Sequence, residues 1–74
     1  MPRSLKYAAA LPALVPVLSH SISNLRKEAA LALGELGDAA ALPALEPVAA
    51  DPDPEVRKAA RLALEQIHAA ASRH

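Results

Sequence analysis

The stretch ALPALVPV at residues 10–17 returns as ALPALEPV at residues 41–48, and this repetition decides the fold. The alignment that it defines lays residues 10–40 over residues 41–71, and nearly half of the aligned positions are identical. The matching Pro, Arg-Lys and Leu-Ala-Leu positions do not depend on the abundance of alanine. A repeat of this length is typical of stacked supersecondary units. We therefore predict two repeats, at residues 10–40 and 41–71.

The composition favours helices throughout the chain. Hydrophobic residues make up 53% of the 74 residues, and most of them are alanine or leucine, which have high helix propensity. Tyr7 is the only aromatic residue, and the strand-favouring β-branched residues are scarce. A chain of this length suits one small domain. We predict an all-α fold.

The second half of each repeat has the pattern of an amphipathic helix. Apolar residues recur there at i, i+4, i+7, i+8 and i+11, which places them on one helical face. In the second repeat these residues are Val56, Ala60, Ala63, Leu64 and Ile67.

Capping residues mark the ends of these helices. Asp53 is the expected N-cap of the last helix, with Pro54 in its first turn. Ser23 is the weaker equivalent cap in the first repeat. Gly37 is expected to end the second helix, and Asp38 to cap the third.

Prolines give the first half of each repeat an unusual character. Pro12 and Pro16 lie four residues apart, as do Pro43 and Pro47. A proline inside a helix removes a backbone hydrogen bond and costs ~3 kcal/mol or more. Either the helix bends as a whole, or the first proline of each pair lies near a helix start and only the second one kinks the helix.

Together these segments predict about four helices, near residues 5–19, 24–36, 39–50 and 54–71. Residues 1–9 are expected to be an N-terminal extension that continues into the first helix. Residues 72–74 are expected to be a C-terminal tail.

The sequence resembles a known repeat family. ALPAL, followed by DPDPEVRKAA at residues 51–60 and ALEQI at residues 63–67, is similar to the short HEAT-like repeat of phycobilisome lyase subunits and many bacterial scaffold proteins. The likeness covers residues 10–71. It implies an α-solenoid of two HEAT-like helical hairpins, stacked in a right-handed sense, with a ridge-like surface that binds other proteins. Because this repeat serves many roles, the resemblance implies no single function.

The resemblance also implies an ion pair between the repeats. HEAT repeats often carry an aspartate six residues before an arginine, and such residues pair between adjacent units. Asp51 and Arg57 have this spacing, whereas the first repeat has His20 and Arg26. We therefore expect Arg26 to pair with Asp51 across the repeat boundary. The alternative is that these residues are solvated charges that contribute little.

The sequence offers little support for catalysis or metal binding. It has no cysteine, and His20, His68 and His74 are too far apart to form a helical metal-binding pair. Gly34 and Gly37 cannot build a phosphate-binding loop, and the serines lack a nucleophile-elbow pattern. We expect no enzyme activity and no cofactor.

The N-terminus imitates a secretory signal. Residues 1–6 are basic, residues 7–18 are apolar, and residues 19–21 could serve as a cleavage site. However, residues 10–17 recur at 41–48 inside the chain, where helix packing explains their apolar character. No apolar run approaches the ~20 residues that span a bilayer. We therefore expect a cytoplasmic protein that does not bind membranes.

A protein partner is expected because stacked repeats need neighbours. Such arrays usually have three or more repeats with polar capping repeats at both ends, and we find two here. An isologous homodimer, joined through an apolar end helix or by swapped hairpins, is the simplest closure. The apolar residues expected at this interface are Leu11, Leu14, Leu18, Leu64 and Ile67. Polar contacts are expected from Arg26, Lys27, Arg57, Lys58 and Arg61.

Two other functions remain open. The family resemblance alone implies a chaperone-like or lyase-associated subunit for bilin attachment. Duplex DNA binding is suggested by the recurring Arg-Lys pairs at residues 26–27 and 57–58. Against DNA binding, the eight basic residues are balanced by eight acidic ones, and no aromatic side chain is available near these pairs to stack on a base. We therefore do not expect nucleic acid as the main partner.

Overall fold

The structure is a computed structural model, and it describes residues 10–72. Within this range the chain is helical and contains no strand, so the predicted all-α fold is confirmed. Residues 10–14 are α-helical and run directly into the first 3₁₀ segment. The elements in order are η1 (Val15–Ser19), α2 (Ser23–Leu36), η2 (Ala39–Ala41), α3 (Leu42–Leu45), η3 (Glu46–Ala50) and α4 (Pro54–Ala71).

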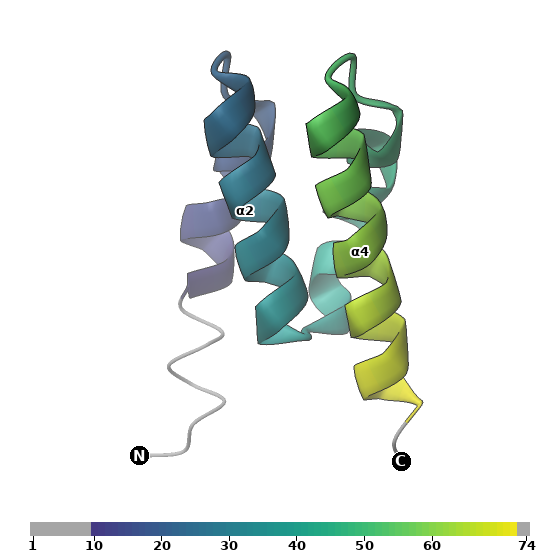
Figure 1. The fold of residues 1–74 in the computed structure, drawn as a ribbon. Coiled ribbons are helices and arrows are strands. Elements are labelled where there is room, and N and C mark those ends of the chain that lie inside the picture. Colours follow the sequence, from purple (N-terminus) through teal and green to yellow (C-terminus); the bar gives the residue numbers. More distant parts are fainter. Residues whose placement is uncertain (1–9, 73–74) are drawn as a thin grey trace.

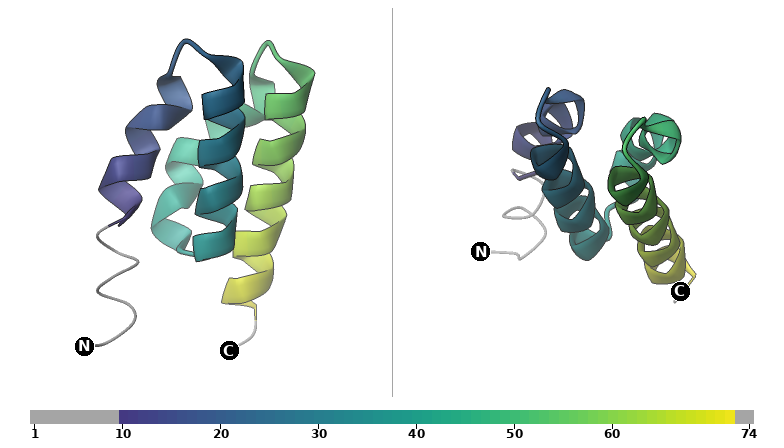
Figure 2. Two further views of the ribbon diagram at one scale, coloured as in Figure 1. Left: turned by 60° about the vertical axis from the view of Figure 1, so that its left-hand side comes forward. Right: turned by 45° about the horizontal axis from the view of Figure 1, so that its top comes forward.

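These elements form two helical hairpins that stack side by side. Residues 10–19 pair with α2 in the first hairpin, and residues 39–50 pair with α4 in the second (Figure 1). α2 and α4 make the most extensive contact of the structure and form one layer, with the first helices of both hairpins behind them. Figure 2 shows the same two layers from the side and from above. This is the arrangement of an α-solenoid.

The predicted bounds of the four helices agree with the structure within the described residues. The predicted start at residue 5 and the extension at residues 1–9 lie outside this range, as do residues 73 and 74 of the predicted tail. The division into repeats at 10–40 and 41–71 stays a prediction. The first helix of the second hairpin begins shortly before that boundary, at Ala39.

The core lies between the two layers, and half of its buried side chains are alanines. The small side chains let the helices approach closely, which a core of larger residues would prevent. The buried residues are Leu18, Ala29, Ala30, Leu33, Ala41, Leu45, Val48, Val56, Ala59, Ala60, Ala63 and Ile67.

α2 and α4 approach each other closely at Gly34. A Cβ atom at this position would lie 2.7 Å from the Cα of Ala63 and 2.9 Å from its Cβ. Both distances are below van der Waals contact, and one of the two neighbours is backbone that cannot rotate away. Gly34 is therefore needed for the packing distance between the hairpins.

Each first helix changes from α to 3₁₀ geometry where its second proline occurs. Pro16 lies in the first turn of η1, and Pro47 lies in the first turn of η3. Pro43 lies in the first turn of α3, directly after the 3₁₀ segment η2 has passed into the α-helix. The second hairpin thus follows the second of the two interpretations. In the first hairpin, Pro12 lies inside the helical residues 10–14.

Three of the four predicted caps are confirmed. The Asp53 side chain accepts hydrogen bonds from the amides of Glu55 (2.8 Å) and Val56 (3.4 Å). Asp38 accepts one from the amide of Ala40 at 2.9 Å. Gly37 ends α2 in the left-handed region, with φ of 69°.

The predicted Ser23 cap is wrong. Ser23 is already the first residue of α2, and the N-cap position is Ile22, which has no side chain able to accept a hydrogen bond. His20 stabilises the start of α2 instead, because its Nδ1 accepts a hydrogen bond from the Ile22 amide at 3.0 Å. The turn before α2 is therefore held by an imidazole that lies just outside the helix.

Candidate functional site

The charged residues of the candidate site begin with an ion pair between the hairpins. Arg26 donates from Nε to Asp51 Oδ2 at 2.8 Å and from Nη2 to Asp51 Oδ1 at 3.0 Å. The two side chains are largely covered, with exposed fractions of 15% and 9%. A bidentate pair of this kind fixes direction as well as distance. The pairing expected across the repeat boundary is present, and it ties α2 to the turn before α4.

The ion pair changes the pKa values of both partners. The hydrogen bond from Arg26, together with one from the Asp53 amide at 2.9 Å, holds the pKa of the Asp51 carboxyl below its ordinary value. The hydrogen bond to Asp51 raises the pKa of Arg26. Both shifts favour the charged forms, as expected when each partner stabilises the charge of the other.

Arg57 makes the equivalent main-chain contacts in the second hairpin. Its Nη1 donates to the carbonyl oxygens of Asp51 (2.8 Å) and Pro52 (3.2 Å). At the equivalent place in the first hairpin, Arg26 Nη1 does the same with His20 (2.9 Å) and Ser21 (3.1 Å). Among the described residues, Arg57 has no carboxylate partner. The spacing of Asp51 and Arg57 therefore reflects a contact to main chain within one hairpin.

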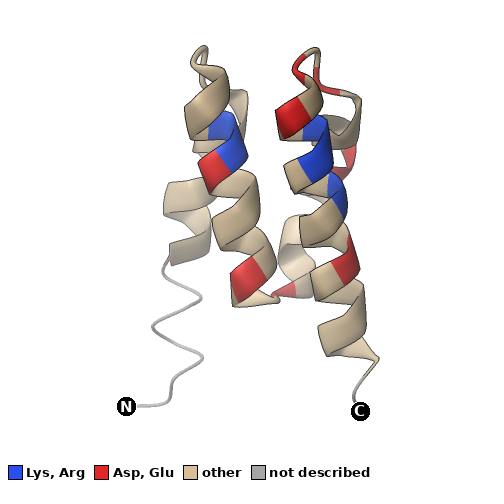
Figure 3. Cartoon of the chain, viewed as in Figure 1, with Lys and Arg blue, Asp and Glu red and all other residues tan. Residues whose placement is uncertain are grey.

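The other basic residues among residues 10–72 lie in the upper halves of α2 and α4 as drawn in Figure 3. In Figure 3 the basic segments of the two helices lie side by side, with acidic segments next to them. Lys27 and Lys58 line a shallow groove of about 270 Å³ between α2 and α4, together with Glu28 and Glu55. Their charges cancel within this groove. The lining of this groove therefore carries charged side chains, but its net charge is close to zero.

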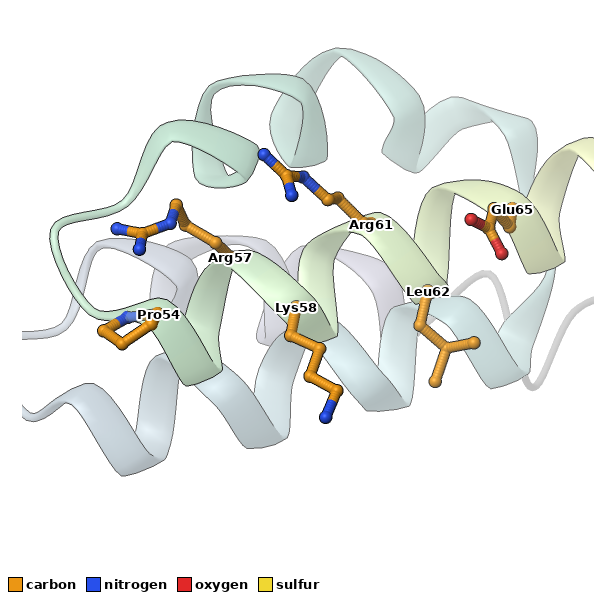
Figure 4. Close-up of a pocket in the computed structure, with 6 residues that line it drawn as sticks. All are labelled: Pro54, Arg57, Lys58, Arg61, Leu62 and Glu65. Carbon is orange, nitrogen blue, oxygen red and sulfur yellow. The ribbon is translucent and has the colours of Figure 1, made fainter.

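A second depression, of about 540 Å³, lies along α4. Three basic residues line it, and Figure 4 shows Arg57 and Arg61 projecting from one side of α4 and Lys58 and Leu62 from the other. Glu65 is the only acidic residue of its lining. This surface carries an excess of positive charge beside an exposed leucine.

The apolar residues that we expected at an interface belong mainly to the core. Leu18 and Ile67 are buried, with exposed fractions of 5% and 0%. Leu11, Leu14 and Leu64 are partly buried and pack against the core. The apolar face of each helix points toward its neighbours, so the residues that define the helical pattern are the ones least available for a partner.

Three large apolar side chains are exposed among residues 10–72, and sequence reasoning did not select them. Ile22, Leu25 and Leu62 are 54%, 38% and 45% exposed. The repeat contained a signal for Leu25, because its counterpart in the second repeat is Val56, which is only 1% exposed. Val56 is covered by the first hairpin, whereas the described chain has nothing equivalent to cover Leu25.

Residues 10–72 show no feature of a metal site or a membrane span. No three His, Asp or Glu side chains of this region lie close enough together to hold a metal ion. None of its helices is both long and apolar enough to cross a bilayer. All buried side-chain nitrogen and oxygen atoms of the described residues have hydrogen-bond partners.

A family model of HEAT repeats matches residues 3–65. The chain belongs to the HEAT-repeat family. HEAT repeats generally mediate protein–protein interaction, and the family is typically non-catalytic. A comparison with proteins of curated function finds no significant match.

The two flanks of this HEAT stack differ in shape and charge. On α2, Gly34 and the fully buried Ala30, one turn before it, form the face on which α4 packs. The counterparts of these residues on α4 are Glu65 and Arg61, which are exposed. A further HEAT hairpin could not approach α4 as closely as α4 approaches α2. The last helix, which we expected to present an uncovered apolar face, has a polar flank.

Proposed function

We propose that this chain is a non-catalytic protein-interaction module that associates with a second copy through the free flank of its first hairpin. The observation that carries the proposal is the difference between Leu25 and Val56. These residues occupy the same place in the repeat, but Leu25 is 38% exposed and Val56 is 1% exposed. A partner that covers Leu25 as the first hairpin covers Val56 would complete the packing of α2.

Physical arguments support a second copy as this partner. Covering the exposed parts of Ile22 and Leu25 contributes roughly 1 kcal/mol for each residue. In an isologous contact the same patch is buried on both chains, so the gain is doubled within one interface. The chain has equal numbers of basic and acidic residues, so two copies do not repel each other at long range. A cytoplasmic location, with the protein acting as a scaffold, is part of this proposal.

The alternative functions gain no support from the described residues. For duplex DNA binding, the recurring Arg-Lys pairs would have to form a basic stripe. Arg26 instead pairs with Asp51, and Lys27 and Lys58 lie beside Glu28 and Glu55. A role in bilin attachment is supported only by the family resemblance. We therefore propose neither as the function.

The proposal is tested by sedimentation equilibrium of the 74-residue chain over a wide range of concentration, with helicity followed in parallel by circular dichroism. We expect a monomer–dimer equilibrium. Leu25→Lys should shift this equilibrium toward the monomer, whereas Leu62→Lys, at an exposed leucine beside the groove between α2 and α4, should leave it unchanged. A chain that stays monomeric and helical at every concentration would overturn self-association.

A further inference from the structure

The guanidinium of Arg57 is held in place and has free donors. Its Nη1 is fixed by the carbonyl oxygens of Asp51 and Pro52. Its Nε and Nη2 donate to no atom of residues 10–72, whereas the same two atoms of Arg26 bind both oxygens of Asp51. Arg57 therefore presents the two donors with which Arg26 holds a carboxylate. Because its position is already fixed, little side-chain entropy is lost when a ligand binds.

The surroundings of Arg57 favour an acidic ligand. Lys58 and Arg61 line the same depression, and Glu65 is its only acid, so the lining residues carry three positive charges and one negative. Leu62 is 45% exposed in the same depression. Figure 4 shows the arginines on one side of α4 and Leu62 on the other. The arginine side of α4 is therefore a site for carboxylates, and Leu62 lies away from it.

A second copy of this chain does not fit the site in the way that the hairpins fit each other. The residue that would meet Arg57 in such a stack is the counterpart of Asp51, and in the first hairpin this residue is His20. The His20 Nδ1 already accepts a hydrogen bond from the Ile22 amide. In addition, Arg61 and Glu65 stand where close packing needs residues as small as Ala30 and Gly34. Stacking of a second copy on α4 would therefore leave Arg57 without a carboxylate.

We infer that the flank of α4 binds an acidic segment of another protein, whose carboxylate occupies on Arg57 the place that Asp51 occupies on Arg26. Arg61, on the same side of α4, adds a second positive charge. The inference rests on the proposed role in protein interaction and does not require self-association. It gives the two flanks different partners: a second copy on the first hairpin and an acidic segment on the second.

The test is an NMR titration of the ¹⁵N-labelled chain with the acetylated, amidated peptide Glu-Asp-Leu-Asp-Glu as the probe. We expect the Nε–Hε resonance of Arg57 to shift with added peptide until the site is saturated. The Nε–Hε resonance of Arg26 should not shift, because its Nε and Nη2 already bind Asp51. The matched control peptide is Gln-Asn-Leu-Asn-Gln, which has the same shape and no carboxylate side chains. It should leave the Arg57 resonance unchanged.

Two variants keep the inference falsifiable. Arg57→Lys keeps the charge but loses the planar fork, and it should weaken peptide binding by about tenfold. Because Arg57 also holds the turn at Asp51, Arg61→Gln serves as a second variant at an exposed position, and it should weaken binding by about threefold. Equal affinity of the wild type and both variants, or a resonance of Arg57 that does not move, would overturn the inference.

The same experiments separate this inference from the proposed function. If the chain dimerises but the peptide does not bind, only the acidic site on α4 is refuted. If the peptide binds to a chain that remains monomeric, only self-association is refuted. Leu25→Lys should dissociate the dimer without changing peptide affinity, because Leu25 and Arg57 lie on opposite flanks of the stack.

Discussion

The two hairpins contain nearly the same arginine but give it different partners. Arg26 and Arg57 each bind two carbonyl oxygens of the turn before their helix. Arg26 also holds Asp51 of the following hairpin, whereas Arg57 has no carboxylate partner in the described chain. The repeat therefore determines the main-chain contacts of the arginine, and the neighbouring hairpin determines whether it has a carboxylate partner.

The same comparison applies to the apolar and small residues. Leu25 is exposed where Val56 is buried, and Glu65 stands where Gly34 allows close contact. Each difference follows from position in the stack: a residue on the shared face must fit a neighbour, and a residue on a free flank need not. Equivalent positions of the two repeats differ mainly in their place in the stack, and most of the variants below form such pairs.

The largest expected effect is at the core leucine of α2. Leu33→Ala should lower the free energy of unfolding by about 3 kcal/mol, because Leu33 is fully buried and its loss leaves a cavity. Its counterpart Leu64 is only partly buried, so Leu64→Ala should cost about half as much. Urea unfolding followed by circular dichroism measures both. Equal losses would mean that the two positions do not differ in burial.

A leucine at the contact of α2 and α4 should have the next largest effect. Gly34→Leu should lower the free energy of unfolding by about 2 kcal/mol or more, since even a Cβ atom would meet the backbone of Ala63. Glu65→Leu places the same side chain at the counterpart position on the free flank of α4. This control should change the unfolding midpoint little. If Gly34→Leu were as stable as the control, the packing distance described above would be contradicted.

A smaller effect is expected from the helix caps. Asp53→Ala should cost about 1 kcal/mol, because Asp53 accepts hydrogen bonds from two amides at the start of α4. Ser23→Ala should cost nothing, because Ser23 lies inside α2 and makes no cap hydrogen bond. Thermal unfolding of the two variants gives the comparison. If Ser23→Ala lowered the thermal stability as much as Asp53→Ala, Ser23 would act as a cap, which would contradict the structure.

The smallest effect is the dependence of stability on pH through Asp51. Its pKa is lower in the folded chain than in the unfolded one, so the ion pair stabilises the fold above the ordinary pKa of an aspartate. This stability is lost as the pH falls through the lowered pKa of the folded state. Arg26→Gln should flatten the acid limb of the stability curve, and Arg57→Gln should leave most of it. The measurement is the urea midpoint from neutral to acidic pH. If the ion pair were unimportant, Arg26→Gln would lose stability on acidification as the wild type does.

Much of the fold followed from the sequence because its signals are local. The repeat, the apolar spacing and the caps at Asp53, Gly37 and Asp38 act within one or two helical turns. The cap at Ser23 was mispredicted because a side chain at that position can equally well lie inside the helix. Here the chain enters α2 one residue earlier, with Ile22 at the N-cap.

The candidate site was harder to predict, because exposure depends on contacts between units. The apolar pattern correctly marked the inward faces of the helices, and for that reason it pointed to Leu18 and Ile67, which are buried. Leu25 carries the same pattern as Val56 and is exposed only because of its place in the stack. The pairing of Arg26 with Asp51 could be predicted because the resemblance to HEAT repeats implies an ion pair between adjacent units.

The most direct test of two unlike flanks uses the absence of cysteine from the sequence. Leu25→Cys and Leu62→Cys each place a single thiol at an exposed leucine, one on the free flank of α2 and one on α4 beside the groove that it shares with α2. The rate of thiol labelling is then measured as the protein concentration rises through the range of self-association. The rate at residue 25 should fall as a second copy covers it, while the rate at residue 62 should stay constant. Equal behaviour of the two thiols, or protection at residue 62 alone, would contradict the proposed division between the flanks.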